Sequence, residues 1–302
     1  MATSKRLTIL TITACACLLA LESASAQAKN AILFIGDGMG IAQVTAARIF
    51  KGNARDGELT LDTMEHTALV RTYSANSLVT DSAAAGTAFA SGIKTNSGMV
   101  GVAPDGQSVP TLLEMAKAAG KSVGLVTTTS ITHATPACFY AHVPKRGMEP
   151  EIAAQLVDSG DVDVLLGGGR TFFLPQGVHD PESNEASKRE DDRDLLSEMA
   201  DRGYRVVRSS EEFEAAAADS ENASGVSKIL GLFSPGMMAF EAQRHHDKWG
   251  EPSVAEMTEL AIKVLSKNPN GYFLMVEGGR IDHACHGNRA YLGVTDLIAF
   301  DK

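Results

Sequence analysis

The feature that most constrains this fold is the repeated alternation of short, continuous apolar runs with amphipathic segments. The apolar runs are rich in Val, Ile, Leu and Phe and do not alternate strictly with polar residues, as expected for strands of a sheet covered on both faces. A repeated strand–helix–strand order predicts an α/β fold with a largely parallel sheet. The predicted strands are 31–36, 122–129, 162–168, 204–209, 228–233 and 271–278.

Capping signals mark three helices between these strands. The first lies between a Pro and a Gly. The second follows Ser209, with Glu212 at the capping-box position. The third opens on Ser253 and Glu256, which form the same pattern. The helices are predicted at 111–120, 210–217 and 253–267.

Composition and charge fit a packed globular protein and argue against some partners. Of the 302 residues, 44% are hydrophobic and 21% are charged, which suits a packed core and not a disordered chain. The length allows one large α/β domain or two smaller ones. The net charge is −10 and no Lys/Arg cluster stands out, which argues against a nucleic-acid-binding surface. The polar, charged segment 176–194 is predicted to be a solvated surface excursion.

The first 26 residues have the pattern of a secretory signal peptide. Lys5 and Arg6 precede the apolar run 7–21, and the sequence Ala-Ser-Ala at 24–26 is a cleavage site. The alternative is an uncleaved anchor, but the apolar run is shorter than the roughly 20 residues that a membrane span needs. The pattern therefore predicts a periplasmic or secreted protein with no stable membrane span after cleavage.

Two cysteines, Cys138 and Cys285, remain after the predicted cleavage. An exported protein could pair them, but the sequence cannot place their Cα atoms within bonding range. We favour two small buried side chains over a disulfide.

A Gly-rich stretch, LFIGDGMG at 33–40, follows the first strand and precedes a predicted helix. It does not have the dinucleotide-binding spacing, because position 41 is Ile. A phosphate could lie on the helix N-terminus, yet Asp37 would repel it unless a cation lay between them. Taken alone, the stretch favours Asp37 as a helix cap or turn residue.

Ser82 begins a run of small helix formers in LVTDSAAAGTAFASG at 78–92. A hydroxyl at the positive end of a helix is well placed for a nucleophile that must accept an anion. Taken alone, an ordinary N-cap is the favoured interpretation. The G-x-S-x-G pattern of serine hydrolases does not surround Ser82.

Four polar residues of interest follow the second strand: His133, Thr135, His142 and Arg146 fall within fourteen residues. A Thr hydroxyl beside a carboxylate suits Mg²⁺. The planar fork of Arg146 could hold two phosphoryl oxygens. The alternative is a turn with a surface arginine.

The stretch VEGGRIDHACHGN at 276–288 places four ligand-type residues directly after the last predicted strand. Asp282 and His286 are four apart and share a face if the segment is helical, which makes them a candidate Zn²⁺ pair. Glu277 ends the strand, and His283 faces elsewhere. The alternative is an exposed polar turn.

Two further stretches resemble sites only superficially. RHHDKW, with His245, His246 and Asp247, lies in a polar connection and is predicted to be a surface turn. LLGGGR at 165–170 lacks the Gly-Lys-Ser/Thr ending of a P-loop and is predicted to be a tight strand exit.

Taken together and in this order, the motifs resemble the alkaline phosphatase family. The pieces GDGMG, TDSAAAGTA, THATPA, AHVPKR and VEGGRIDH begin at residue 36 and, with His286, end at residue 286. The resemblance implies a three-layer α/β/α sandwich with a largely parallel central sheet, in one catalytic domain over residues 27–302. It also implies hydrolysis of small phosphate monoesters through a phosphoserine intermediate, and it makes a homodimer an expectation.

The resemblance also assigns roles to residues. Ser82 is then the nucleophile and Arg146 the clamp on the phosphoryl oxygens. The implied metals are two Zn²⁺ and one Mg²⁺. His133 and His283 occupy places where some members carry Asp and Lys, which is similar to the branch with histidine at both. The implied metal-site residues are Asp37, Ser82, His133, Thr135, Glu277, Asp282 and His286.

The sequence departs from the family pattern near its end. The pattern has an Asp-His pair and a later His after the VEGGRIDH segment, together with further strands, and this sequence stops at LIAFDK. We therefore expect a C-terminally incomplete alkaline phosphatase. Two alternatives stay open: a non-catalytic fragment that binds metal or phosphate, and a sibling phosphodiesterase. A sulfatase is disfavoured because no C/S-x-P-x-R context surrounds Ser82.

Overall fold

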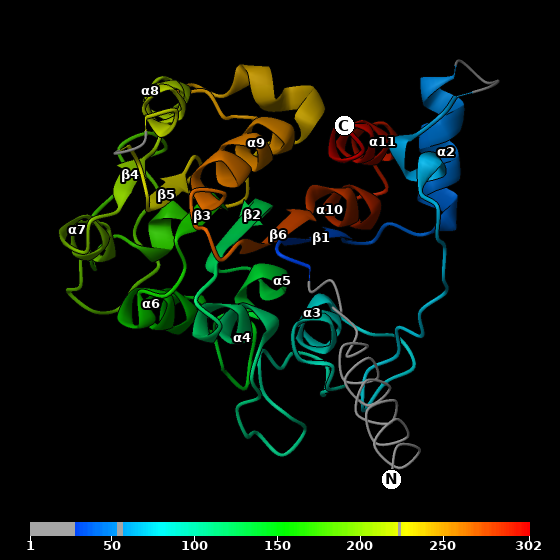
Figure 1. Cartoon of the computed structure of the whole chain (residues 1–302), viewed down its shortest axis with the longest axis horizontal. Helices are drawn as coiled ribbons and strands as arrows, with labels where there is room; N and C mark the ends of the chain where they lie inside the picture. Colours follow the sequence, from blue (N-terminus) through cyan, green and yellow to red (C-terminus); the bar gives the residue numbers. More distant parts are fainter. Residues whose placement is uncertain (1–27, 53–56, 223–224) are drawn as a thin grey trace, which may run out of the picture. The chain divides into compact units, whose positions relative to one another are not determined.

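A six-stranded sheet forms the centre of the computed structural model, which describes residues 28–52, 57–222 and 225–302. The strand order is β1-β6-β2-β3-β5-β4 (Figure 1), and each of these pairings is parallel. Every predicted strand is confirmed, with ends that differ by at most two residues. The strands are β1 Ala31–Gly36, β2 Ser122–Ser130, β3 Val164–Gly168, β4 Arg205–Val207, β5 Ile229–Leu232 and β6 Tyr272–Gly278.

Side chains of the central strands alternate between two apolar clusters, one on each face of the sheet. In β2, Leu125 packs into the first cluster and Val126 into the second. In β6, Met275 and Val276 divide in the same way. Because both faces are apolar, these strands read as continuous hydrophobic runs.

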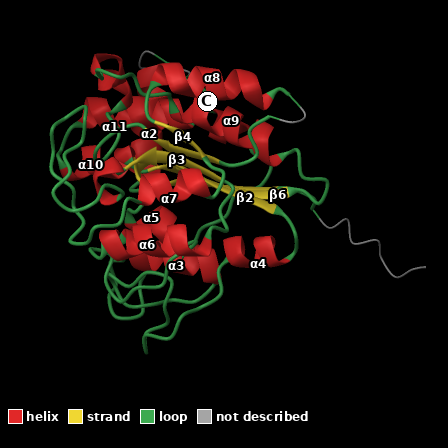
Figure 2. Ribbon diagram, turned by 90° about the vertical axis from the view of Figure 1, so that its left-hand side faces the viewer, coloured by secondary structure: helices red, strands yellow, loops and turns green. Residues whose placement is uncertain are grey.

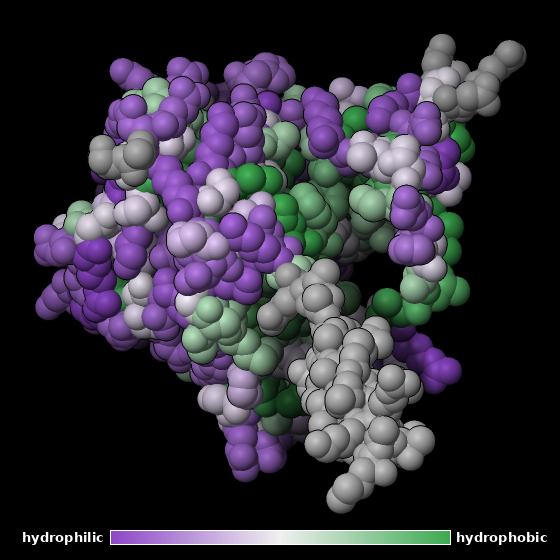
Figure 3. Space-filling model, in the orientation of Figure 1, coloured by the Kyte–Doolittle hydropathy of each residue, from purple (hydrophilic) through white to green (hydrophobic). Residues whose placement is uncertain are grey.

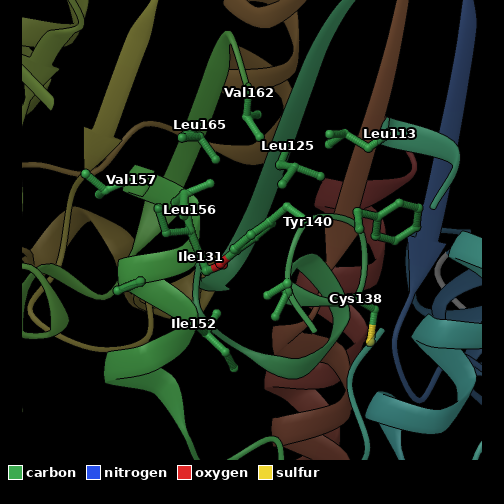
Figure 4. Close-up of a cluster of buried hydrophobic side chains, with 14 of the residues drawn as sticks. Leu113, Leu125, Ile131, Cys138, Tyr140, Ile152, Leu156, Val157, Val162 and Leu165 are labelled. Atoms are coloured by element: carbon green, nitrogen blue, oxygen red, sulfur yellow. The ribbon is translucent and has the colours of Figure 1, made fainter. Parts of the chain in front are cut away.

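Helices cover both faces of the sheet and confirm the α/β/α sandwich. Helices α3, α4 and α6 lie on one side, and α8, α9 and α11 lie on the other (Figure 2). On the first side, Ile152 and Leu156 of α6 pack toward Leu125 and Leu165 of the sheet (Figure 4). The helices are α2 Ile41–Lys51, α3 Ser82–Ser91, α4 Leu112–Ala118, α5 Ala134–Ala137, α6 Glu149–Ser159, α7 Leu195–Asp201, α8 Ser210–Ser220, α9 Val254–Leu265, α10 Arg280–His286 and α11 Ala290–Phe300, with 3₁₀ helices η1 Thr60–Thr63, η2 Arg170–Phe172 and η3 Glu241–His246.

The predicted helix starts are confirmed, with one difference in detail. Ser253 and Glu256 form a complete capping box at α9. At α8 the hydroxyl of Ser209 accepts from the N–H of Glu212, but the Glu212 carboxylate accepts from the N–H of Arg208 and does not reach back to Ser209. The glutamate therefore binds the residue before the N-cap, and not the N-cap residue as the capping-box pattern predicts.

The prediction that 176–194 is a solvated excursion is wrong for two of its charged residues. Asp180 and Arg189 are buried. Asp180 pairs with Arg170, whose guanidinium is fully buried and also reaches Glu182 and the carbonyl of Leu232. Two carboxylates of the segment thus neutralise a buried arginine, which composition alone does not reveal.

One edge of the sheet carries exposed apolar side chains. In the part of the chain that the structure describes, β1 pairs only with β6, and Phe34 is 51% exposed. Ile49 and Phe50 of α2 are exposed as well, and so are Leu69 and Leu78 of the following segment. Figure 3 shows apolar surface along this side of the molecule.

The predicted signal peptide, residues 1–26, lies outside the described residues. Within the described ranges, no helix combines the length and apolar character that crossing a membrane requires.

We expect Arg170→Ala to lower the free energy of unfolding by about 3–5 kcal/mol, because it leaves the buried Asp180 carboxylate without its counter-charge. The matched control is Arg205→Ala, which removes an ion pair with the more exposed Asp219 and should cost about 1 kcal/mol or less. Urea unfolding followed by circular dichroism measures both. Equal losses in the two variants would contradict this account of the segment.

Candidate active site

The candidate site lies beyond the carboxyl ends of β1 and β6, where parallel sheets bind ligands. These strands are neighbours, so their ends bring Asp37 and Glu277 to the same edge of the sheet. A pocket of about 720 Å³ opens there. Among the residues that line it are Asp37, Ser82, His133, Thr135, Arg146, Asp282, His283 and His286. All the predicted site residues except the buried Glu277 therefore face one pocket.

Asp37, Ser82 and Asp282 meet at the centre of this pocket. The hydroxyl of Ser82 donates to Oδ2 of Asp37 over 2.8 Å. Burial, and then the nearby charge of Asp282, raise the pKa of Asp37. Gly38 has φ +64°, and a Cβ there would lie 2.6 Å from Oδ1 of Asp282. The glycine thus permits both the turn after β1 and the close approach of the two acidic segments.

The local structure explains why Ser82 is free to face Asp37. Asp81 caps α3 by accepting from the N–H of Ala84. Ser82 is therefore the first helical residue, and the N-cap favoured for this stretch alone is present but is made by Asp81. The Ser82 hydroxyl stands at the positive end of the helix, where negative charge is stabilised.

Arg146 is held from two sides. Its Nη1 donates to Asp81 over 3.2 Å, and its Nη2 donates to Nε2 of His133 over 2.9 Å. Burial, followed by the charge of Arg146, lowers the pKa of His133 to about 3. His133 is therefore neutral, and its buried Nδ1 has no hydrogen-bond partner among the described residues.

Glu277 is a fully buried carboxyl with one oxygen bound and one free. Its Oε2 accepts from Thr127 over 2.5 Å and from Thr129 over 3.2 Å. Its Oε1 has no hydrogen-bond partner in the described chain. Burial raises the pKa of Glu277 to about 7, and the charge of Asp37 adds to the rise, against the hydroxyls of Thr127 and Thr135. An unpartnered buried oxygen beside a hydroxyl and a second carboxylate fits a hard cation such as Mg²⁺.

The predicted helical pair in the last motif is confirmed. Asp282 and His286 lie on one face of α10, with Oδ2 and Nε2 3.3 Å apart. His286 is exposed, whereas His283 turns inward and packs its ring edge to face against His133 at 5.4 Å. Within the described ranges, however, no group of three or more His, Cys, Asp or Glu side chains is arranged to hold an ion by itself. An ion here would take part of its coordination from hydroxyl groups or water.

The other candidates lie away from the pocket. His142 bonds Gly101 and Glu114 and does not join the site. His245 and His246 are exposed in η3, so the predicted surface turn is confirmed. Gly168 approaches the carbonyl of Gly236 at the end of β3, as a tight strand exit requires. Cys138 and Cys285 are both free, as favoured, although Cys285 is only half-buried.

Three contributors were not singled out from the sequence: Asp81, Thr127 and Thr129. The run of Thr at the end of β2 is the one available signal, because hydroxyls are uncommon in a strand buried on both faces. The target of the two threonines, Glu277, is known only once β2 and β6 pair, with Thr127 opposite Glu277.

Comparison with known proteins agrees with this geometry. The family model described as alkaline phosphatase matches residues 28–302. The chain belongs to the alkaline phosphatase family. It is 38% identical to the alkaline phosphatase of Gadus morhua over 91% of this chain and 64% of that protein, and 40% identical to the tissue-nonspecific isozyme of Gallus gallus over 91% and 59%. It thus spans about 60% of the length of these curated relatives.

Solved alkaline phosphatase structures share the fold. The enzyme of the Antarctic bacterium TAB5 superposes with a TM-score of 0.75 at 32% identity, over 90% of this chain and 72% of that one. The Thermus thermophilus enzyme gives 0.79 at 37% identity, over 90% and 54%. A TAB5 variant with a histidine replaced by glutamate has Mg bound in a site called M3.

We expect Mg²⁺ affinity to depend on the ionisation of Glu277. Its pKa is raised from 4.5 to about 7, so the native carboxyl is mostly neutral below pH 7 and mostly charged above it. A cation must displace that proton. Affinity should therefore fall roughly tenfold per unit as the pH drops below about 7, and level off above it. Calorimetric titration with Mg²⁺ at several pH values measures this.

Two variants control the measurement. Glu277→Gln should bind Mg²⁺ weakly and lose the slope below pH 7. Glu251→Gln should keep it, because Glu251 is a buried carboxyl with a pKa also raised to about 7 but does not line the pocket. An unchanged slope in Glu277→Gln would show that another group binds the proton.

Proposed function

We propose that this chain carries the catalytic centre of a metal-dependent phosphomonoesterase that works through a phosphoserine. One observation carries the proposal: Ser82 Oγ, at the start of α3, donates to Asp37 in the same pocket that contains the guanidinium of Arg146. A nucleophilic hydroxyl and an anion-binding fork thus share one space. Membership of the alkaline phosphatase family supports the same reaction.

The acidic residues imply bound cations, which we propose to be two Zn²⁺ and one Mg²⁺. Glu277, Thr135 and Asp37 would hold Mg²⁺, with His133 near it, and Asp37, Ser82, Asp282 and His286 would hold Zn²⁺. When bound, these ions supply the positive charge that allows carboxylates to stand beside a phosphate and favours ionisation of a serine hydroxyl.

The protein's own side chains position the reaction. Asp37 Oδ2 accepts the hydrogen bond of the Ser82 hydroxyl. The hydroxyl proton therefore points toward Asp37, and the lone pairs of Oγ are free to attack. Oγ then loses its proton and forms a bond to phosphorus while the ester P–O bond breaks, and the leaving oxygen takes up a proton and departs as the alcohol. Water later cleaves the phosphoserine and releases phosphate. Arg146, oriented by Asp81 and His133, holds two phosphoryl oxygens through this displacement.

The substrate class follows from the pocket. A monoester has three free phosphoryl oxygens, so a guanidinium fork can bind two and leave one for the cations, whereas a diester has only two free oxygens and less negative charge. We therefore propose small phosphomonoesters as substrates. Hydrolysis of an aryl phosphate and of a bis-aryl phosphate, compared under the same conditions, separates this proposal from a sibling phosphodiesterase.

The cellular setting is part of the proposal. The N-terminal pattern supports export to the periplasm or secretion, and other members of the family suggest a homodimer. Metal analysis of the purified chain tests the ion content. Two zinc and one magnesium per chain support the complete site, whereas little or no zinc supports a fragment that binds metal or phosphate without turnover.

We expect Ser82→Ala to abolish the phosphoenzyme and lower aryl phosphate hydrolysis roughly a thousandfold or more, because the attacking oxygen is removed. The assay uses the 302-residue chain with added Zn²⁺ and Mg²⁺. Ser91→Ala, in the last turn of the same helix, is the matched control and should keep both activities. Acid-quenched labelling with a radioactive phosphomonoester detects the phosphoserine.

The outcomes separate the alternatives. Wild-type phosphoenzyme that disappears in Ser82→Ala supports the proposal. Phosphate binding without turnover, unchanged in Ser82→Ala, identifies a binding fragment. Turnover that survives in Ser82→Ala contradicts the role of this serine.

A further inference from the structure

Arg280, the first residue of α10, is a half-buried cation outside the proposed catalytic groups. Its Nε is buried without a hydrogen-bond partner among the described residues, and its guanidinium stacks on Phe240 with 3.7 Å from Cζ to the ring centroid. The carboxylates of Asp296 and Glu251 are near enough to act on its charge, but neither forms an ion pair with it in the described chain. Withdrawing part of a charged group from water without an ion pair is costly.

The side chain of Arg280 makes one hydrogen bond in the part of the chain that the structure describes. Its Nη1 donates to Nδ1 of His283 over 3.0 Å. A guanidinium is permanently protonated and has only donors. Nδ1 of His283 must therefore be the acceptor, and the ring proton is on Nε2.

His283 faces the pocket, whereas Arg280 does not. The ring of His283 lines the same space as Ser82 and Arg146, and Arg280 is absent from that lining. Nε2 of His283 has no partner among the described residues. With Nδ1 occupied, Nε2–H is the one donor that this ring can offer to a bound anion.

The backbone and the neighbouring histidine fix the position of this pair. The N–H of Arg280 donates to the hydroxyl of Thr128 over 3.1 Å, which ties the start of α10 to β2. The ring of His133 packs against the ring of His283, and Nε2 of His133 accepts a hydrogen bond from Arg146. Each ring is thus bonded to one guanidinium: His133 to that of Arg146, which lines the pocket, and His283 to that of Arg280, which does not.

We propose that Arg280 is a positioning residue that keeps Nδ1 of His283 unprotonated and so presents Nε2–H as a hydrogen-bond donor to a phosphoryl oxygen in the pocket. The inference rests on the proposed function for its ligand, a phosphate group. The first part of the inference, which concerns the tautomer of His283, can be tested without measuring any activity.

The tautomer is tested by ¹⁵N NMR of histidine-labelled chain at about pH 8, where an ordinary histidine is neutral. We expect the wild-type His283 signals of an unprotonated Nδ1 and a protonated Nε2, assigned by their loss in His283→Ala. Arg280→Met keeps the length of the side chain but removes the donors, and should shift the signals toward a mixture. A wild-type ring protonated on Nδ1 overturns the inference, even if Arg280→Met does not fold.

The consequence for binding is tested with inorganic phosphate by calorimetry in the presence of Zn²⁺ and Mg²⁺. Arg280→Met should weaken phosphate binding about tenfold, as expected for one hydrogen bond to a charged group. In a His283→Ala background it should have no further effect. Arg244→Met is the matched control, because Arg244 bonds Glu241 and Glu251 and not His283. Arg280→Lys, which keeps a donor, should restore part of the loss.

The outcomes distinguish this inference from the proposed function. An additional loss of similar size in the His283→Ala background overturns the positioning role and assigns Arg280 to folding. Wild-type chain that binds no phosphate overturns the proposed function and the ligand half of the inference, while the NMR result still decides the tautomer.

Discussion

Negative charge placed out of water at the ends of β1 and β6 is the constraint on which the site depends. Asp37 directly follows β1, and Glu277 lies near the end of the paired strand β6. Asp282 approaches this region at Gly38, where a glycine leaves room for it. Burial raises the pKa of both strand-end carboxyls, and a neighbouring charge adds to each rise, Asp282 for Asp37 and Asp37 for Glu277. Carboxyl groups in this environment are stable only when they are protonated or bound to cations. Binding of a cation here therefore displaces protons.

The positive groups of the pocket are arranged around this charge without neutralising it. Arg146 gives one hydrogen bond to Asp81 and another to a neutral histidine, so neither is spent on Asp37 or Glu277. Threonine hydroxyls bind one oxygen of Glu277 and leave the other free. These hydrogen bonds fix the positions of the side chains. They leave the carboxylates able to bind a cation and the guanidinium able to bind an anion.

The sequence predicts the sheet well because every central strand is apolar on both faces, and that pattern is visible in Val, Leu and Ile runs without any knowledge of pairing. Asp37 and Ser82 stand out locally because one follows a strand and the other begins a helix. Their roles and that of Arg146 rest on the family resemblance, because each stretch alone favours a cap, a turn or a surface arginine. The sequence does not predict that Thr127 lies opposite Glu277, since register is a tertiary property. For the same reason the fully buried Arg170 and its partner Asp180 look like surface residues in the sequence.

The position of β1 at the open edge of the sheet has a consequence for dynamics. An edge strand held by one neighbour is among the first elements to exchange its amide protons through local opening. Because Asp37 follows this strand directly, each such opening also dismantles the serine–aspartate contact. By linkage, any ligand that binds Asp37 only in the closed state must slow amide exchange along residues 31–36, so this edge strand reports on occupancy of the pocket.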